Sequence, residues 1–244
     1  IKKQIKKINF SNSKDLPPMA SSFFGYFGYE TINYIEAISK KRKNNKLKMP
    51  DTILFLPEII IIHDNKINKI FISSPILEAS TNIEDYNLIL NIFNKIELEL
   101  KKNKICKNIN LKKIKTLKPK SNIKKNDFVK KINKTKKYIY NGDIFQTVIS
   151  QRFEVNYKKN AKSLYQALRK TNPSPFMFMF NFPNFKIVGS SPEILVRVKK
   201  NRITIRPIAG TRPRGKNKKI DMKNENNLLS DKKELSEHLM LLDL

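Results

Sequence analysis

Apolar residues in the first hundred positions form short runs typical of strands and one longer run typical of a helix. An aromatic block at 23–29 contains Gly25 and Gly28, and glycines in such a block predict a strand that another backbone approaches closely. Residues 52–63 predict a buried strand, with 67–73 as its hairpin partner. Apolar positions three and four apart in 82–101 predict an amphipathic helix.

The second half of the chain combines hairpins with helices. Asn126 or Asp127 is positioned to cap a helix that ends at Asn141-Gly142. The other expected elements are strands at 144–153, 176–181, 186–189, 195–199 and 202–206, a helix at 163–170, and a last helix capped by Asp231 and Glu234, with Leu235, His238, Leu239 and Leu242 as its apolar stripe. This order predicts an α+β fold, with antiparallel sheets and flanking helices.

The basic and weakly periodic stretch 101–125 predicts a linker between an N-terminal region, 1–100, and a second domain, 126–244. The chain begins with Ile1 and ends at Leu244 within an apolar periodic run. We therefore expect a fragment of a longer protein, with a fold that is incomplete at the C-terminus.

The formal net charge of +29 at first predicts a nucleic-acid partner. The excess is mostly lysine, scattered among asparagine and isoleucine and without interleaved aromatic residues, so a solvated surface is the preferred interpretation. A nucleic-acid-binding protein remains the alternative from a different class. The single cysteine, Cys106, and the absence of a long apolar run favour a cytoplasmic protein that does not enter a membrane.

Two features suggest chemistry from the residues alone. The turn 206–215 combines glycines, prolines and arginines, and its Ala209 and Gly210 leave room for a small anion near backbone N–H groups. Glu234 and Glu237 lie three apart on the last helix and so project to nearly the same side, which suits a hard divalent cation but is also typical of a solvated acidic stripe.

Three further positions have a structural and a functional interpretation. Gln146 on its predicted strand faces either a pocket or water, and Glu193 is either an exposed turn residue or a buried acid with a raised pKa. The segment 172–178 forms either core or a site for a flat apolar ligand, and its residues are Asn172, Pro173, Ser174, Pro175, Phe176, Met177 and Phe178.

Taken in order, the motifs resemble a known family. They read GDIFQ at 142–146, SQRF at 150–153, NPSP at 172–175, GSSPE at 189–193, PIAGTR at 207–212 and ELSEHLM at 234–240. This series resembles the chorismate-utilising enzymes, and among them the large subunits of anthranilate synthase. The N-terminal block 25–29 and the strand ending at 63–64 resemble the same family, so the resemblance covers nearly the whole chain.

The resemblance implies an activity and a set of site residues. Members of the anthranilate branch convert chorismate and ammonia to anthranilate and pyruvate with Mg2+, and a glutamine amidotransferase subunit supplies the ammonia. Carried over to this sequence, Glu234 and Glu237 match metal-site glutamates, with Glu237 the direct ligand. Ala209, Gly210 and Thr211 match the substrate pocket, and Glu193 matches the acid that assists departure of the ring hydroxyl.

Two positions separate the sister activities within the family. Relatives that use water as the nucleophile carry a lysine base where this chain has Gln146, so Gln146 fits amination. The aminodeoxychorismate synthases typically have lysine where this chain has Ala209. Ala209 therefore favours anthranilate synthase, with aminodeoxychorismate synthase as the nearest alternative.

The resemblance also bears on regulation. Residues 172–178 match part of the family's tryptophan feedback pocket, whose second motif, of the Leu-Leu-Glu-Ser type, does not occur in this sequence. Because later site residues of the family would follow Leu244, we expect this polypeptide alone to be inactive.

Overall fold

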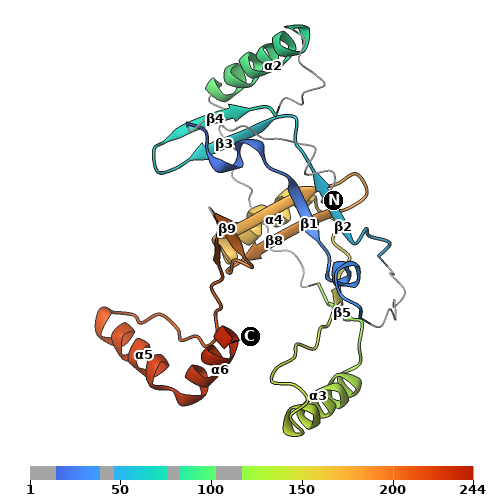
Figure 1. The fold of residues 1–244 in the computed structure, drawn as a ribbon, viewed down its shortest axis with the longest axis vertical. Coiled ribbons are helices and arrows are strands. Elements are labelled where there is room, and N and C mark those ends of the chain that lie inside the picture. The colour runs from blue at the N-terminus through green and yellow to red at the C-terminus, as the bar shows by residue number, and fades with distance from the viewer. Residues whose placement is uncertain (1–14, 39–46, 76–82, 103–116, 200, 244) are drawn as a thin grey trace. The chain divides into compact units, whose positions relative to one another are not determined.

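The computed structural model describes residues 15–38, 47–75, 83–102, 117–199 and 201–243. The chain divides into two compact units, residues 1–107 and 108–244 (Figure 1). The division falls within the stretch 101–125 that we predicted to be a linker, most of which lies outside the described residues. No helix in the described part of the chain is both long enough and apolar enough to cross a lipid bilayer.

The first unit contains two antiparallel strand pairs, β1 with β2 and β3 with β4. Its elements are η1 (Pro18–Ser21), β1 (Phe24–Phe27), η2 (Tyr29–Tyr34), β2 (Thr52–Phe55), β3 (Ile60–Asp64), β4 (Lys69–Ser73) and α2 (Ile83–Lys101). The predicted hairpin at β3–β4 and the helix from about residue 82 to 101 are both confirmed.

Gly25 allows the close pairing of β1 with β2. Its φ is +152°, and a β carbon on it would overlap the backbone carbonyl of Ile53 in the neighbouring strand. The prediction of a close backbone approach in the aromatic block is therefore confirmed.

The predicted single strand from 52 to 63 is wrong. Residues 56–59 are not in a strand, and β2 and β3 belong to different sheets. Pro57 lies in this interruption, and proline has no N–H to donate to a strand ladder.

The second unit contains three antiparallel strand pairs and four helices among its described residues. Its elements are β5 (Lys120–Ser121), α3 (Lys125–Tyr140), β6 (Phe153–Glu154), α4 (Ala161–Thr171), β7 (Phe176–Asn181), β8 (Lys186–Ser191), β9 (Arg197–Lys199), β10 (Arg202–Thr204), α5 (Lys218–Ser230) and α6 (Lys232–Asp243). Because β5 pairs with β6, this unit already begins before residue 126.

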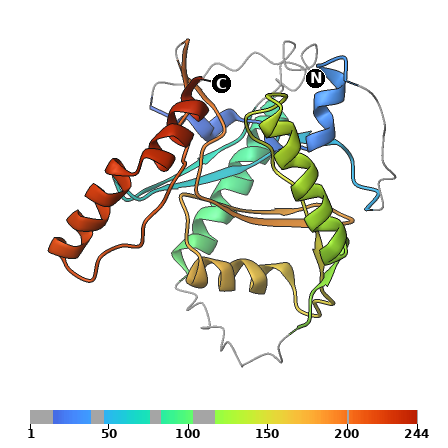
Figure 2. The ribbon, with the colours of Figure 1, turned by 90° about the horizontal axis from the view of Figure 1, so that it is seen from below.

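The β7–β8 hairpin is the centre of the second unit. Alternate aromatic residues of β7 continue into the following turn, with ring centroids 5.7 Å apart for Phe178 and Phe180, and 5.8 Å apart for Phe180 and Phe182. Phe182 is buried, and α4 packs against the hairpin (Figure 2). Asn160 caps α4, since its Oδ1 accepts a hydrogen bond from the Ser163 N–H at 2.8 Å.

Three predictions for this unit need correction. Helix α3 begins at Lys125 rather than after Asn126 or Asp127, and its N-cap, Lys124, forms no side-chain cap. The predicted strand 144–153 is reduced to β6, because only its end pairs with β5. Helix α5 was not predicted at all.

The apolar stripe predicted for the last helix is only partly covered. Leu235, Leu239 and Leu242 are each about half exposed, at 49%, 50% and 56%. The stripe is therefore not a buried core among the described residues.

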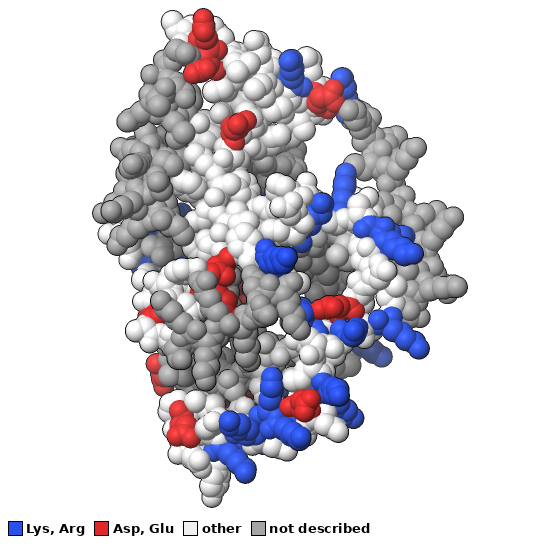
Figure 3. Space-filling view, turned by 90° about the vertical axis from the view of Figure 1, so that its right-hand side faces the viewer, with Lys and Arg blue, Asp and Glu red and all other residues white. Residues whose placement is uncertain are grey.

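The described elements confirm the α+β class, with short antiparallel sheets and separate helices. On the face shown in Figure 3, lysine and arginine side chains are interspersed with carboxylates. Helix α3 is rich in lysine, and Lys134 lies over the ring of Tyr138 at 5.6 Å from its centroid.

Candidate functional site

The predicted substrate segment lies in a loop that joins β10 to α5, and α5 holds the far end of this loop. The backbone N–H of Gly215 donates to Asp221 Oδ1 at 2.7 Å, and Arg214 Nη2 lies 2.7 Å from Asp221 Oδ2. Asn217 caps α5 by accepting a hydrogen bond from the Ile220 N–H at 3.0 Å. The loop therefore enters α5 along a defined path.

Two asparagines on the same face of α5 hold the middle of the loop. Asn224 Nδ2 donates to the Pro213 carbonyl at 2.8 Å, and Asn227 Oδ1 accepts from Arg212 Nε at 2.8 Å. Asp221, Asn224 and Asn227 are three residues apart and so line one side of the helix. This polar stripe fixes the loop by hydrogen bonds to its backbone and to Arg212.

Arg212 joins the loop to both helices. Besides Asn227 on α5, its guanidinium contacts Asp231 Oδ2 through Nη2 at 2.8 Å and Glu234 Oε1 through Nη1 at 3.1 Å. Nη1 also donates to the Thr211 carbonyl at 3.0 Å. The side chains of Arg212, Asp231 and Glu234 are 24%, 35% and 22% exposed, so this network is partly shielded from water.

Asp231 caps α6, as predicted. Its Oδ1 accepts hydrogen bonds from the N–H groups of Lys233 at 3.0 Å and Glu234 at 3.3 Å. The backbone N–H of Glu234, with smaller contributions from that of Lys233 and from Arg212, holds the pKa of the Asp231 carboxyl below its ordinary range. The side chain of Glu234 pairs with Arg212 instead of closing the capping pair.

Glu234 also lies directly against the loop. A β carbon on Gly210 would overlap Glu234 Oε2, so any larger residue at this position would require the Glu234 carboxylate to move. A pocket of about 300 Å³ is lined by Pro207, Ile208, Ala209, Gly210, Leu228, Leu229, Glu234, Leu235 and His238. The structure thus brings Ala209, Gly210 and Glu234 to one pocket, and His238 lines it as well.

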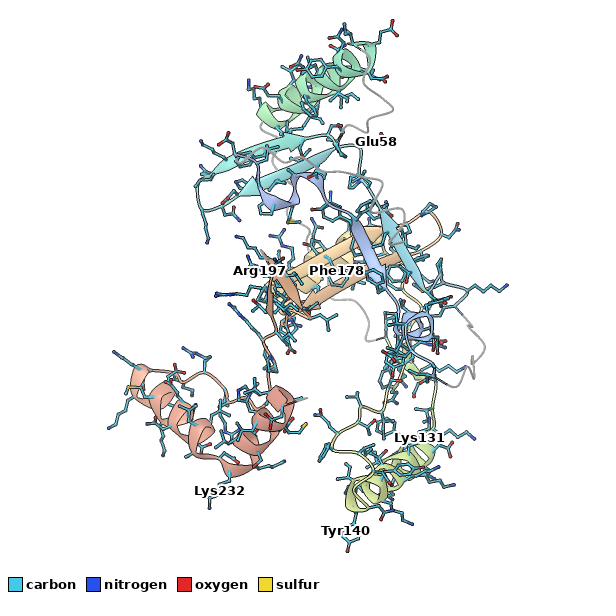
Figure 4. All side chains as sticks on the ribbon, in the orientation of Figure 1. Glu58, Lys131, Tyr140, Phe178, Arg197 and Lys232 are labelled. Carbon is cyan, nitrogen blue, oxygen red and sulfur yellow. The ribbon has the colours of Figure 1, made fainter. Side chains whose placement is uncertain are left out.

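Glu193 lies at a second pocket. Its Oε1 accepts a hydrogen bond from the Ile208 N–H at 3.0 Å, and its side chain is exposed rather than buried. A pocket of about 510 Å³ is lined by Pro175, Phe176, Pro192, Glu193, Ile194, Arg197, Thr204, Arg206, Pro207 and Ile208. Arg197 and Phe178, labelled in Figure 4, come from β9 and β7 of the same unit.

The segment predicted to bind tryptophan is divided between this pocket and the hairpin. Pro175 and Phe176 line the pocket that contains Glu193. Ser190 Oγ donates to the Asn172 carbonyl at 2.6 Å and can accept a hydrogen bond from Ser174 Oγ at 2.9 Å, which fixes the start of the segment. Phe178 packs over Gly189 within the β7–β8 hairpin.

Gln146 is exposed and lies in a segment without secondary structure, so its predicted strand face does not form in the described structure. A strand needs a hydrogen-bonded partner, and residues 144–152 have none among the described strands. The described structure does not bring Gln146 to either pocket.

The two predicted metal ligands differ in their surroundings. Glu237 is half-buried and forms no ion pair or hydrogen bond with any described side chain, whereas Glu234 is held by Arg212. Carboxylate oxygens are the ligands that Mg2+ prefers, so the pair fits part of such a site. Within the described ranges, no group of three or more His, Cys, Asp or Glu side chains could hold a metal ion.

The sequence contained a signal for two features that were not predicted, the role of Arg212 and the polar face of α5. Polar side chains recur three apart at 221, 224 and 227 on one face of α5, and Asp231 and Glu234 follow at the start of α6. Arg212 precedes them in a turn that contains glycine and proline, and its guanidinium has enough N–H donors to bind several of these acceptors at once.

A comparison with known protein families assigns the chain to one of them. The model of the chorismate binding enzymes matches residues 2–244, so the chain belongs to this family. Anthranilate synthase component 1 of Aquifex aeolicus strain VF5 is 38% identical over 245 residues, which cover 100% of this chain and 49% of that protein. The corresponding component 1 of Cereibacter sphaeroides is 38% identical, with 94% and 46% covered.

A solved structure shows the same fold. The crystal structure of anthranilate synthase component I from Streptococcus pneumoniae TIGR4 has a TM-score of 0.82 at 30% identity, with 98% of this chain and 52% of that chain covered. The chain therefore spans about half the length of these relatives.

Proposed function

We propose that the complete gene product is the large subunit of anthranilate synthase. It would convert chorismate and ammonia to anthranilate, pyruvate and water. The observation that carries this proposal is the contact of the Ala209–Thr211 loop with Glu234, which brings the predicted substrate segment and a predicted metal carboxylate to one pocket. The similarity to anthranilate synthase component 1 proteins supports it.

In this proposal the pocket beside Ala209 and Gly210 receives the ring and carboxylate of chorismate. The small side chain of Ala209 leaves the space that a lysine would fill, which favours anthranilate synthase over aminodeoxychorismate synthase. Gln146 has no basic group for activating water, and ammonia needs less activation. Both positions support amination of the ring.

Glu237 and Glu234 are the residues of this chain that would hold Mg2+. When bound, Mg2+ would offset the charge of the substrate's ring carboxylate. Arg212 keeps the Glu234 carboxylate directed toward Gly210. Glu237 would be the direct ligand, because Glu234 already shares one oxygen with Arg212.

Glu193 would protonate the ring hydroxyl so that it leaves as water while ammonia forms its bond to the ring, because the electron pair that ammonia displaces departs with the hydroxyl. The ring then loses a C–H proton and its enolpyruvyl group, and the enolpyruvyl group takes up a proton and leaves as pyruvate, which gives the aromatic ring. The hydrogen bond from Ile208 N–H to Glu193 Oε1 links this acid to the start of the substrate loop. A proton donor of this kind requires a protected carboxyl, so this role requires a cover over Glu193 that the described residues do not provide.

Two partners complete the proposal. A glutamine amidotransferase subunit would supply ammonia, in keeping with the component 1 designation of the relatives. Tryptophan would act as a feedback inhibitor through the segment 172–178, whose Pro175 and Phe176 line the Glu193 pocket.

Product identification tests the proposed function. The complete gene product is incubated with chorismate, Mg2+ and ammonium, and the products are separated and measured by fluorescence and mass. We expect anthranilate and pyruvate in equal amounts. Formation of 4-amino-4-deoxychorismate would show the sister activity, and unchanged chorismate would reject both.

A further inference from the structure

Arg212 contacts both helices of the site, although it is not among the predicted substrate or metal residues. Its guanidinium has acceptors on both helices: Asn227 on α5, Asp231 at the start of α6, and Glu234 within α6. The three distances lie between 2.8 and 3.1 Å. A planar group with several fixed donors suits such a set, whereas a lysine ammonium would not span it.

The same guanidinium fixes one end of the Glu234 carboxylate while Gly210 confines the other. Oε1 accepts from Arg212 Nη1, and Oε2 lies against the α carbon of Gly210. Without Arg212, the flexible Glu234 side chain would lose the contact that directs it, and Asp231 would lose its cationic partner. The position of a candidate metal carboxylate therefore depends on this arginine.

We propose that Arg212 is a positioning residue of the site, which holds Glu234 in the orientation required for divalent-cation binding and keeps the substrate loop in register with α6. This proposal rests on the proposed function. Arg212 acts here through Glu234 and the loop, and makes no contact of its own with the cation.

Charge and geometry predict opposite results when Arg212 is replaced. If Arg212 acted only through its charge, its removal would strengthen cation binding, since one positive charge near the site is lost. If it orients Glu234, its removal weakens cation binding. Replacing a residue that orients a metal ligand typically lowers metal affinity by about 10- to 100-fold.

The test measures Mn2+ affinity, as a spectroscopic substitute for Mg2+, by electron paramagnetic resonance of free Mn2+ in the complete gene product. The variants are Arg212→Gln, which removes the charge, and Arg212→Lys, which keeps the charge but loses the planar set of donors. The matched control is Arg214→Gln, because Arg214 lies two residues away and its side chain is 92% exposed, with one ion pair to Asp221.

We expect both Arg212 variants to bind Mn2+ about tenfold or more weakly, and Arg214→Gln to bind as the unsubstituted protein does. Circular dichroism and thermal unfolding give the folded fraction of each variant. This fraction sets the concentration of binding sites from which each affinity is calculated. Should a variant fail to fold, a double substitution that combines Arg212→Lys with Glu234→Asp provides a second measurement, and it should bind no more weakly than Glu234→Asp alone.

Two results would overturn the proposal. One such result is an Mn2+ affinity that is unchanged in both Arg212 variants. The other is tighter Mn2+ binding by Arg212→Gln together with an unchanged Mn2+ affinity of Arg212→Lys. Either result would exclude the positioning role of Arg212 and leave the proposed function intact. An absence of Mn2+ binding by the unsubstituted protein would remove the metal site itself, and product identification would then decide separately whether the proposed function stands.

Discussion

The carboxylate of Glu234 closes over the α carbon of Gly210, so closely that a β carbon on residue 210 would overlap Oε2. Glu234 cannot simply turn away, because Arg212 holds its other oxygen. The contact joins the loop after β10 to helix α6, and the whole of helix α5 lies between these two segments in the sequence.

Replacing Gly210 should therefore be costly, and the cost should depend on Glu234. The φ of Gly210 is not in the left-handed region, so alanine is acceptable to the backbone and only the overlap opposes it. We expect Gly210→Ala to lower the free energy of unfolding by about 1–3 kcal/mol, the usual cost of forcing extra volume into a packed site. Urea denaturation of the complete gene product measures this.

A double-substitution cycle provides the control. In a Glu234→Ala background the obstructing carboxylate is gone, and Gly210→Ala should cost less than about 0.5 kcal/mol. Equal costs in the two backgrounds would show that the overlap with Glu234 is not the cause.

Enlarging Ala209 should impair substrate binding more than stability. Ala209 lines the pocket of about 300 Å³ beside Glu234, and the added methyl groups of Ala209→Val would occupy part of it. We expect the KM for chorismate to rise about tenfold, which corresponds to about 1.4 kcal/mol of binding. Ala37→Val, at an exposed position of the first unit, is the control and should leave KM unchanged. An unaltered KM in Ala209→Val would place chorismate elsewhere.

Neutralising Glu237 should weaken the divalent-cation site. Glu237 is half-buried and has no ion-pair partner among the described side chains, so its charge is available to a cation. We expect Glu237→Gln to raise the Mg2+ concentration needed for half-maximal activity by about tenfold or more, since a carboxylate is exchanged for a weaker neutral ligand. Glu225→Gln, on the exposed surface of α5, is the control. A shift of equal size in both variants would indicate a general electrostatic effect.

The first unit should lose stability at alkaline pH through Tyr26. Burial, with a contribution from the charge of Asp51, raises the pKa of the Tyr26 hydroxyl above its ordinary value of 10.0. Its neutral form donates to the Pro50 carbonyl at 2.7 Å. The unfolded chain therefore ionises first, so this contribution is full below pH 10 and is lost as the pH rises through the raised value.

The measurement is urea denaturation of the unsubstituted protein and of Tyr26→Phe between pH 7 and 11. At pH 7 the substitution should cost about 1 kcal/mol, the usual net value of a hydrogen bond. The difference between the two proteins should shrink above pH 10. A difference that stays constant across this range would contradict the assignment.

Local patterns predicted many elements correctly because those elements are stabilised by near neighbours. The hairpin β3–β4, helix α4 and the Asp231 cap of α6 all follow from residues a few positions apart. The α+β class followed from their order.

The errors arose where a distant partner decides the structure. The alternating pattern at 144–153 predicts a strand, yet among the described residues only its end finds a partner, in β5. The pattern at 52–63 is apolar throughout, and Pro57 divides it between two sheets.

The structure brings three of the predicted site residues to one pocket, but their connections to the rest of the site were not predictable. Ala209, Gly210 and Glu234 were identified from motifs, whereas the role of Arg212 depends on three acceptors spread from 227 to 234. Helix α5 has no strong apolar periodicity, because its inner face carries Asp221, Asn224 and Asn227 for the loop. A search for apolar periodicity therefore overlooks it.

Hydrogen–deuterium exchange tests most directly whether the loop and α6 form one wall of the chorismate site. The complete gene product is compared with and without chorismate and Mg2+, in the absence of ammonia and glutamine so that amination cannot proceed. We expect slower exchange of the backbone N–H groups at 209–211 and in the first turn of α6, with exchange in α2 unchanged. Chorismate binding that protects other segments and leaves 209–211 and α6 unchanged would contradict it.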